Sequence, residues 1–147
     1  MRAVLTRVRS AEVRVDDSPV GAIGPGLLAL VGVAPSDGPA QVAWLADKIR
    51  DLRCFPGPDG RPMDRAVHEV GGAVLVVSQF TLLADCRRGR RPDFTAAAAP
   101  AHAAPLIDAL VDRLRATGLP VETGRFGAHM AVSSINDGPV TLLLDTP

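Results

Sequence analysis

The residues best suited to chemistry form the stretch Ser78–Leu82, which reads Ser-Gln-Phe-Thr-Leu. It follows an apolar run, Ala73–Val77, whose length and β-branched residues predict a buried strand. A strand that ends in Ser78, Gln79 and Thr81 brings hydroxyls, an amide and free backbone N–H groups to one sheet edge, where sites are usually built. The same hydroxyls could simply end the strand by bonding local backbone groups. Both interpretations are open at this point.

A serine, threonine or cysteine nucleophile needs a base beside it. No histidine is close to Ser78 or Thr81 in the sequence, although His68 or His129 could approach in space. Cys86 precedes two arginines, which would lower the pKa of its thiol and favour the nucleophilic thiolate. A serine- or cysteine-dependent esterase is therefore an alternative whose base is unidentified.

A basic segment begins five residues after Leu82 and places four arginines in five positions, namely Arg87, Arg88, Arg90 and Arg91. Such a segment could clamp the phosphates of RNA, or it could be a solvated loop. The formal net charge of the chain is +0, so its global charge indicates no nucleic-acid partner. A non-enzymatic RNA-binding module is a second alternative.

Metal and cofactor signals are missing from the sequence. The two cysteines and three histidines are scattered and match no metal-ligand spacing, so no metal is expected. Gly21, Gly24 and Gly26 lie between predicted strands in the order G-x-x-G-x-G, which does not fit a dinucleotide-binding loop. We expect no cofactor.

Length and composition predict one globular domain over residues 1–147, with 47% hydrophobic and 22% charged residues. The longest apolar run, Leu27–Ala34, is interrupted by Gly32 and is too short to span a membrane. Met1–Val4 enters an alternating pattern without the features of a signal peptide. We expect a cytoplasmic protein.

The elements that must position these residues are strands at the start, middle and end of the chain and two helices. Period-2 alternation and apolar runs predict strands over Met1–Val8, Glu12–Val15, Val20–Ile23, Leu27–Val33, Ala73–Val77, Met130–Ile135 and Val140–Leu144. Helical spacing predicts a helix over Ala40–Arg53, with Asp37 as its cap, and another through Leu106–Leu114 that stops at Gly118. The last two strands are expected to be joined by a turn, Asn136–Pro139. The class is α+β with a mainly antiparallel, barrel-like sheet and two principal helices.

Taken together, the sequence resembles the D-aminoacyl-tRNA deacylases. Two stretches, Ser78–Leu82 and Asn136–Thr141, resemble the signature motifs of that family. The likeness extends along nearly the whole chain and includes Met1–Val4 with Arg7-Val8, Gly24–Leu28, Gly89–Pro92 and Glu122–Ala128. Six matches in order are far more specific than one five-residue motif. Cys86 and His129 depart from the common pattern, but both lie outside the two signatures.

The resemblance implies a homodimer with active sites at its interface, and hydrolysis of the ester that links a D-amino acid, or mischarged glycine, to the 3′-terminal adenosine of tRNA. Backbone N–H groups around Phe80 would stabilise the oxyanion. Ser78, Gln79 and Thr81 would form the pocket wall, and the terminal 2′-hydroxyl of the tRNA would replace a side-chain nucleophile. This agrees with the missing base.

The resemblance also implies a chiral selector. The peptide bond between Gly138 and Pro139 would be cis and would enter the pocket of the partner subunit, where its carbonyls receive the α-amino group and L-amino acids are rejected. Arg7 would hold this loop. The remaining substrate-binding residues implied are Phe126, Met130 and Asn136, and the arginine segment would contact tRNA.

Overall fold

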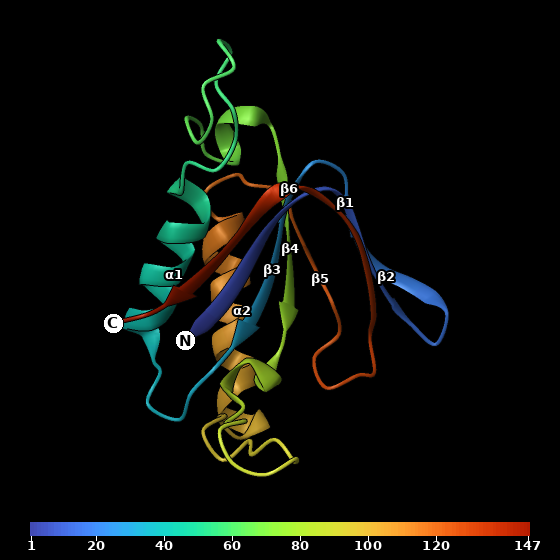
Figure 1. Ribbon diagram of the computed structural model, residues 1–147, viewed down its shortest axis with the longest axis vertical. Coiled ribbons are helices and arrows are strands. Elements are labelled where there is room, and N and C mark those ends of the chain that lie inside the picture. Colours follow the sequence, from blue (N-terminus) through green and yellow to red (C-terminus); the bar gives the residue numbers. More distant parts are fainter.

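The protein, seen here in a computed structural model of residues 1–147, is a six-stranded mixed sheet with two α-helices against one face (Figure 1). The strands are β1 (Arg2–Val15), β2 (Ser18–Ile23), β3 (Gly26–Gly32), β4 (Ala73–Ser78), β5 (Val121–Thr123) and β6 (Ala131–Asp145). The helices are α1 (Pro39–Asp51) and α2 (Pro100–Arg115), with two short 3₁₀ helices, η1 (His68–Val70) and η2 (Phe80–Leu83). The α+β class with two principal helices is confirmed.

The long strand β1 organises the sheet. Its first half, Arg2–Val8, lies between β3 and β6, and its second half, Ala11–Val15, lies between β2 and β6, always antiparallel. The pairs β3–β4 and β4–β5 are parallel. The sheet curls until β2 approaches β5, where a Cβ on Gly21 would lie 2.3 Å from the Thr123 carbonyl oxygen. Only glycine fits this contact, which nearly closes the sheet.

Two hydrophobic clusters fill the two faces of the sheet. The larger packs the apolar stripes of α1 and α2 against it, and the smaller lies on the curled face. The central strand β4 serves both, because Val74 and Val76 belong to the larger cluster and Leu75 and Val77 to the smaller. Burial on both faces explains why the apolar run of β4 is unbroken. Each fully buried side chain of this kind stabilises the fold by about 1.5–3 kcal/mol.

Two predicted boundaries are wrong, for one physical reason. The strands expected at Met1–Val8 and Glu12–Val15 are one strand, β1, and those expected on either side of Asn136 are one strand, β6. A long partner lets each strand continue past residues that favour turns. The residues that favour a turn form a bulge in β6. Thr6 pairs with Thr141 and Val8 pairs with Asn136, so β6 has more residues than β1 between these two pairs. The intervening residues of β6 therefore leave the ladder.

Asp37 does not cap α1 as expected. The residue before the helix is Gly38, whose N–H donates to the Gln41 side chain at 3.0 Å. The Asp37 carboxylate instead accepts the Ala34 N–H at 2.6 Å and pairs with the amino group of Met1 at 2.5 Å. Asp37 thus ties the start of β1 to the loop that precedes α1.

No helix here is both long and apolar enough to cross a membrane.

Candidate active site

The carboxyl end of β4 presents free backbone donors. Gln79 extends the strand by donating its N–H to the Val31 carbonyl at 2.7 Å, and the chain then turns into η2. The N–H groups of Phe80 and Thr81 come before the first hydrogen-bonded residue of that turn, Leu82, so the turn itself does not use them. Free N–H groups at a helix start are suited to a negative charge, including an oxyanion.

The hydroxyls of this motif have no base. The Gln79 amide donates to the Thr81 hydroxyl oxygen, so that hydroxyl is held by an amide. The ring of His68 lies against the Arg50 carbonyl at 3.1 Å, and His102 meets the Asp37 carbonyl at 2.9 Å, both away from the motif. His129 lines neither of the cavities described below. The arrangement does not support a side-chain nucleophile.

The two cysteines are also poor candidates for a nucleophile at this motif. Burial raises the pKa of the Cys54 thiol, with the nearby Arg7 acting in the opposite direction. The thiol is therefore held in its neutral, unreactive form. Cys86 is exposed in the loop after η2 and does not line the cavity beside Ser78.

An apolar cavity of about 350 Å³ opens beside these donors. Nine of its thirteen lining residues are hydrophobic, and they come from the end of β3, η2, the segment before α2, α2 itself and the loop after β5. Phe80 and Phe94 meet edge to face with their ring centroids 5.1 Å apart, and Phe126 lines the cavity with 40% of its surface exposed. Exposed aromatic rings around an apolar cavity are suited to stacking on a planar base.

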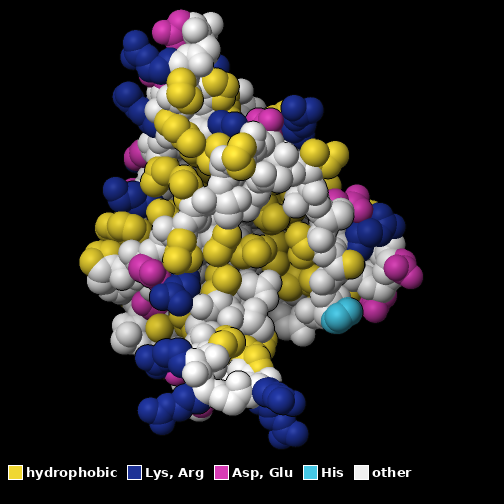
Figure 2. All heavy atoms as spheres, viewed as in Figure 1, with side chains coloured by type: hydrophobic (Ala, Val, Ile, Leu, Met, Phe, Trp, Pro, Cys, Tyr) yellow, Lys and Arg dark blue, Asp and Glu magenta, His cyan; other side chains and the backbone are white.

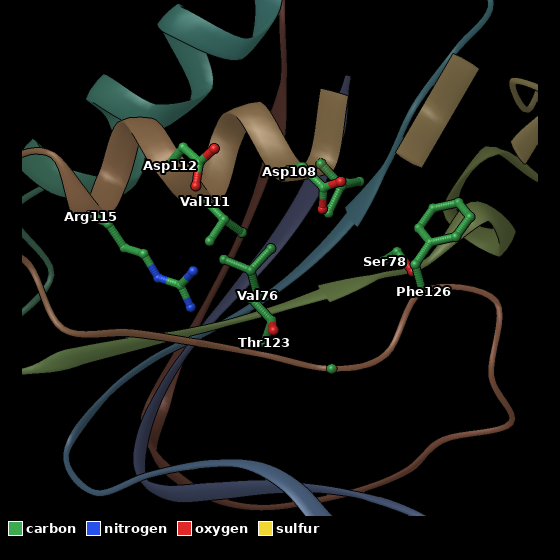
Figure 3. Close-up of a pocket in the computed structure, with 10 residues that line it drawn as sticks. Val76, Ser78, Asp108, Val111, Asp112, Arg115, Thr123 and Phe126 are labelled. Carbon is green, nitrogen blue, oxygen red and sulfur yellow. The ribbon is translucent and has the colours of Figure 1, made fainter. Parts of the chain in front are cut away.

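A second cavity, also about 350 Å³, adjoins the first between α2 and the strands β4 and β5 (Figure 3). We call it the α2 groove. It shares Ser78, Ile107 and Phe126 with the apolar cavity, but it is lined largely by polar groups, including Asp108 and Asp112. This groove was not predicted from the sequence. The sequence pattern that could have indicated the groove is a pair of carboxylates four residues apart, beside the apolar stripe of α2.

The second signature lies in the bulge of β6. The Gly138–Pro139 peptide bond is cis. Arg7 holds the bulge by donating from Nε to the Asp137 carbonyl at 2.9 Å and from a terminal nitrogen to the Cys54 carbonyl at 2.6 Å. The same Nε lies 3.2 Å from the Asp137 carboxylate, and the Arg7 side chain is only 14% exposed.

Asn136 completes the anchoring of this bulge. Its side-chain amide donates to the Arg7 carbonyl at 3.2 Å. A Cβ on Gly138 would lie 2.3 Å from the Asn136 amide oxygen and 3.0 Å from the Val140 nitrogen, so a larger residue there would displace the Asn136 side chain. Phe55 supports the Arg7 guanidinium from the side, with the guanidinium carbon 5.9 Å from the ring centroid.

The two signatures lie at opposite ends of the sheet in one chain. Arg7 pairs with Leu27, and Leu27 pairs with Val74 near the start of β4. Ser78 is four residues further along β4, about 13 Å away at the rise of a strand. One chain therefore does not bring the bulge to the Ser78–Leu83 segment.

The remaining expected residues divide between these places. Phe126 lies beside Ser78 in both cavities, whereas Asn136 lies beside Arg7 at the bulge. Met130 lines neither cavity and packs against the smaller hydrophobic cluster. A Cβ on Gly124 would lie only 2.6 Å from the Met130 sulfur.

The arginine segment forms a closed loop. Asp85 and Asp93 exchange backbone hydrogen bonds of 2.8 and 3.0 Å. Arg87 bonds the Asp85 carboxylate and holds the pKa of that carboxyl below its usual value, while the Thr95 N–H does the same for Asp93. The other three arginines, Arg88, Arg90 and Arg91, form no ion pair within the chain.

These arginines lie near the cavity end of the molecule. Figure 1 places the segment after η2 at the lower end of the molecule, and Figure 2 shows basic side chains projecting from that end. Hydrophobic side chains gather in the middle of the same view (Figure 2). The exposed guanidinium groups are therefore available to a partner at the end of the sheet that carries the cavities.

Comparisons with known proteins agree with this geometry. A solved structure named "c-Myc DNA Unwinding Element Binding Protein" superposes with a TM-score of 0.94 at 35% identity, covering 100% of this chain and 99% of the other. A second, "Structural Analysis of a probable eukaryotic D-amino acid tRNA deacylase", has a TM-score of 0.82 at 17% identity, covering 97% of each chain. The barrel-like α+β fold is thus a known one.

The family model described as D-Tyr-tRNA(Tyr) deacylase matches residues 4–145, which places the chain in a class of hydrolases. A protein of Kineococcus radiotolerans named D-aminoacyl-tRNA deacylase is 57% identical over 146 residues, covering 99% of both chains. One of Heliobacterium modesticaldum with the same name is 55% identical, covering 99% of this chain and 96% of the relative. The chain belongs to the D-aminoacyl-tRNA deacylase family, as its sequence indicated.

Proposed function

We propose that the protein hydrolyses the ester between a D-amino acid and the 3′-terminal adenosine of tRNA, and also cleaves mischarged glycyl-tRNA. The adenine occupies the apolar cavity, and the ester carbonyl oxygen faces the N–H groups of Phe80 and Thr81. The observation that carries this proposal is the pairing of free backbone donors with an aromatic-walled cavity. Family membership supplies the substrate class.

The chemistry uses a group of the substrate. Water attacks the ester carbon, the oxyanion forms against the backbone donors, and the bond to the 3′-oxygen breaks as that oxygen takes a proton. The neighbouring 2′-hydroxyl of the adenosine supplies the catalytic group that the chain lacks around Ser78 and Thr81. Thr81 forms part of the wall, with its hydroxyl held by Gln79.

The functional unit in this proposal is a homodimer. The bulge at Gly138–Pro139 and the cavity lie at opposite ends of one sheet, so a second copy must bring them together. The strand β6 offers a surface for that copy, since Val132, Ile135 and Leu143 are 40%, 59% and 61% exposed. A two-fold interface completes two sites at once, with each bulge entering the other subunit.

The bulge of the partner subunit provides stereochemical selection. Its backbone carbonyls receive the α-amino group, which leaves the side chain of a D-amino acid free and drives that of an L-amino acid into the bulge. Glycine has no side chain to reject and is admitted. Asn136 and Arg7 keep the bulge in place, Phe126 lines the binding surface, and Met130 supports that surface from the smaller hydrophobic cluster.

The decisive experiment compares D- and L-aminoacyl-tRNA that carry the same side chain, with glycyl-tRNA as a third substrate. We expect the D ester and the glycyl ester to be cleaved and the L ester to survive. A D-aminoacyl-tRNA ending in 2′-deoxyadenosine should be cleaved far more slowly. Comparable rates on D and L esters would overturn the proposal.

Two variants separate this chemistry from a serine-, threonine- or cysteine-dependent esterase. Thr81→Ala and Cys86→Ala should both retain measurable hydrolysis, because neither side chain attacks the ester. Loss of all activity in Thr81→Ala, with an unchanged circular dichroism spectrum, would assign the nucleophile to that hydroxyl. Binding of tRNA without any hydrolysis would instead favour an RNA-binding module.

A further inference from the structure

The α2 groove continues the apolar cavity in one direction only. Both are bordered by Ser78, Ile107 and Phe126, whereas Phe80 and Phe94 line the apolar cavity alone. A ligand whose adenine fills the apolar cavity and whose ester meets the Phe80 N–H therefore has the groove on its opposite side. In that arrangement the preceding nucleotide of the RNA would lie on the groove side, and the amino acid would lie away from it.

The groove presents unpaired acceptors. Asp108 and Asp112 are four residues apart on α2, are exposed to solvent and line the groove, and Figure 3 shows both projecting from that helix. Neither carboxylate forms an ion pair within the chain. In contrast, Asp47 and Asp51 of the neighbouring helix α1 are paired with arginines.

The one basic group of the groove is already engaged. Arg115 donates two hydrogen bonds, of 2.9 and 3.2 Å, to the Val121 carbonyl. The groove therefore offers carboxylate acceptors and little free positive charge. Phosphate is repelled by such a lining, so the sugar-phosphate backbone must run outside it.

The chemistry that fits is an amino group on the edge of a base. Carboxylates accept hydrogen bonds from the exocyclic amine of cytosine, whereas uracil presents a carbonyl oxygen at the same position and is repelled. The nucleotide before the terminal adenosine of tRNA is a cytidine. Its amine is a donor that the Asp108 and Asp112 carboxylates, which have no ion-pair partner in the chain, can accept.

We propose that the α2 groove binds this penultimate cytidine and that Asp108 and Asp112 accept hydrogen bonds from its amino group. The inference rests on the proposed function, because it takes the adenosine to lie in the apolar cavity. It adds a specificity determinant on α2, outside both signature motifs. It also explains why two carboxylates stand unpaired beside a site for a polyanion.

The test uses three chemically prepared esters of one D-amino acid, on adenosine, on cytidylyl-adenosine and on uridylyl-adenosine. For the wild-type protein we expect kcat/KM about tenfold higher on the cytidylyl ester than on the uridylyl ester, the lower range for one base contact. In the double variant Asp108→Asn, Asp112→Asn the amides also donate hydrogen bonds, so the ratio should fall to about one or invert. Because the ratio is taken within each variant, a general loss of activity cancels.

The control is Glu122→Gln, which removes one negative charge from β5 outside the groove and should keep the wild-type ratio. A wild-type ratio near one, or a tenfold ratio that survives in the double variant, would overturn the inference. The inference would also be overturned if the double variant lost cleavage of D-lysyl-adenosine but kept cleavage of D-norleucyl-adenosine. That result would mean that the groove holds the amino-acid side chain. No cleavage of the adenosine ester by the wild type would instead overturn the proposed function.

Discussion

The end of β4 and the bulge of β6 are built in different ways. The segment Ser78–Leu83 follows a strand that is buried on both faces, and its donors are backbone N–H groups left free by the start of η2. The bulge Asp137–Val140 leaves its sheet and is held by one nearly buried arginine, Arg7, from another strand. One region is shaped by local backbone, and the other by a single long-range side chain.

This difference predicts where each region is vulnerable. The β4 end should tolerate the loss of its hydroxyls, because its proposed chemistry uses the backbone. The bulge should not tolerate the loss of Arg7, because the Asp137 and Cys54 carbonyls depend on the same guanidinium. Substitutions at the two regions therefore test which kind of construction each depends on.

The largest effect is expected for Arg7→Ala. Hydrogen bonds to charged groups contribute about 1.5–3 kcal/mol each, and two are lost here, so kcat/KM on a D-aminoacyl-adenosine should fall about 100-fold or more. The control is Arg9→Ala, since Arg9 is 74% exposed and meets the Asp137 carboxylate at 3.3 Å. We expect that variant to lose less than threefold. Equal losses in both would show that Arg7 does not hold the bulge.

The second prediction asks whether the two regions act across two copies. Ala97→Phe fills the apolar cavity of one copy and Arg7→Ala releases the bulge of another, so each variant alone should be nearly inactive. In a refolded equal mixture, half the dimers are mixed, and one of their two sites combines an intact cavity with an intact bulge. Activity should recover to about a quarter of the wild-type value. Recovery to no more than the sum of the separate variants would place both regions within one copy.

The same contrast explains what the sequence could predict. The strand β4 and both helices follow from local periodicity, and the end of β4 was located from its apolar run and the polar residues after it. The continuous strand β6 could not be seen, because Asn136–Pro139 has the composition of a turn. Only its pairing with β1 overrides that signal, and pairing between residues more than a hundred positions apart is not a local property.

The cavities show the same limit. Phe94 and Phe126 come from two loops, and nothing in their spacing indicates that both line one cavity with Phe80. The role of Arg7 entered through family resemblance, and the structure supplies its physical basis in the contacts to Asp137 and Cys54. The sequence shows which residues could take part in the chemistry. It does not show the contacts that bring them together, because those contacts depend on the tertiary fold.

A smaller effect is expected for Phe94→Ala. Its ring meets Phe80 edge to face at 5.1 Å, and such pairs contribute about 0.5–1.5 kcal/mol beyond burial. KM for a D-aminoacyl-adenosine should rise about two- to tenfold with kcat little changed, because the cavity wall binds the base equally before and during the reaction. Phe94→Leu keeps an apolar side chain and should give a smaller rise. A large fall in kcat without a change in KM would move Phe94 from binding to catalysis.

The smallest effect concerns the arginine segment, which lies at the cavity end of the molecule and which we expect to contact only the body of the tRNA. Arg88→Ala and Arg91→Ala should each weaken tRNA binding a few-fold and lower the slope of log affinity against log salt by about one, while adenosine-ester hydrolysis is unchanged. Arg87→Ala is the matched control, because Asp85 already pairs with that guanidinium. It should change the slope less. Equal changes in all three variants would mean that the segment acts through net charge alone. No change in any of them would mean that the segment is a solvated loop and that the site binds only the terminal nucleotides.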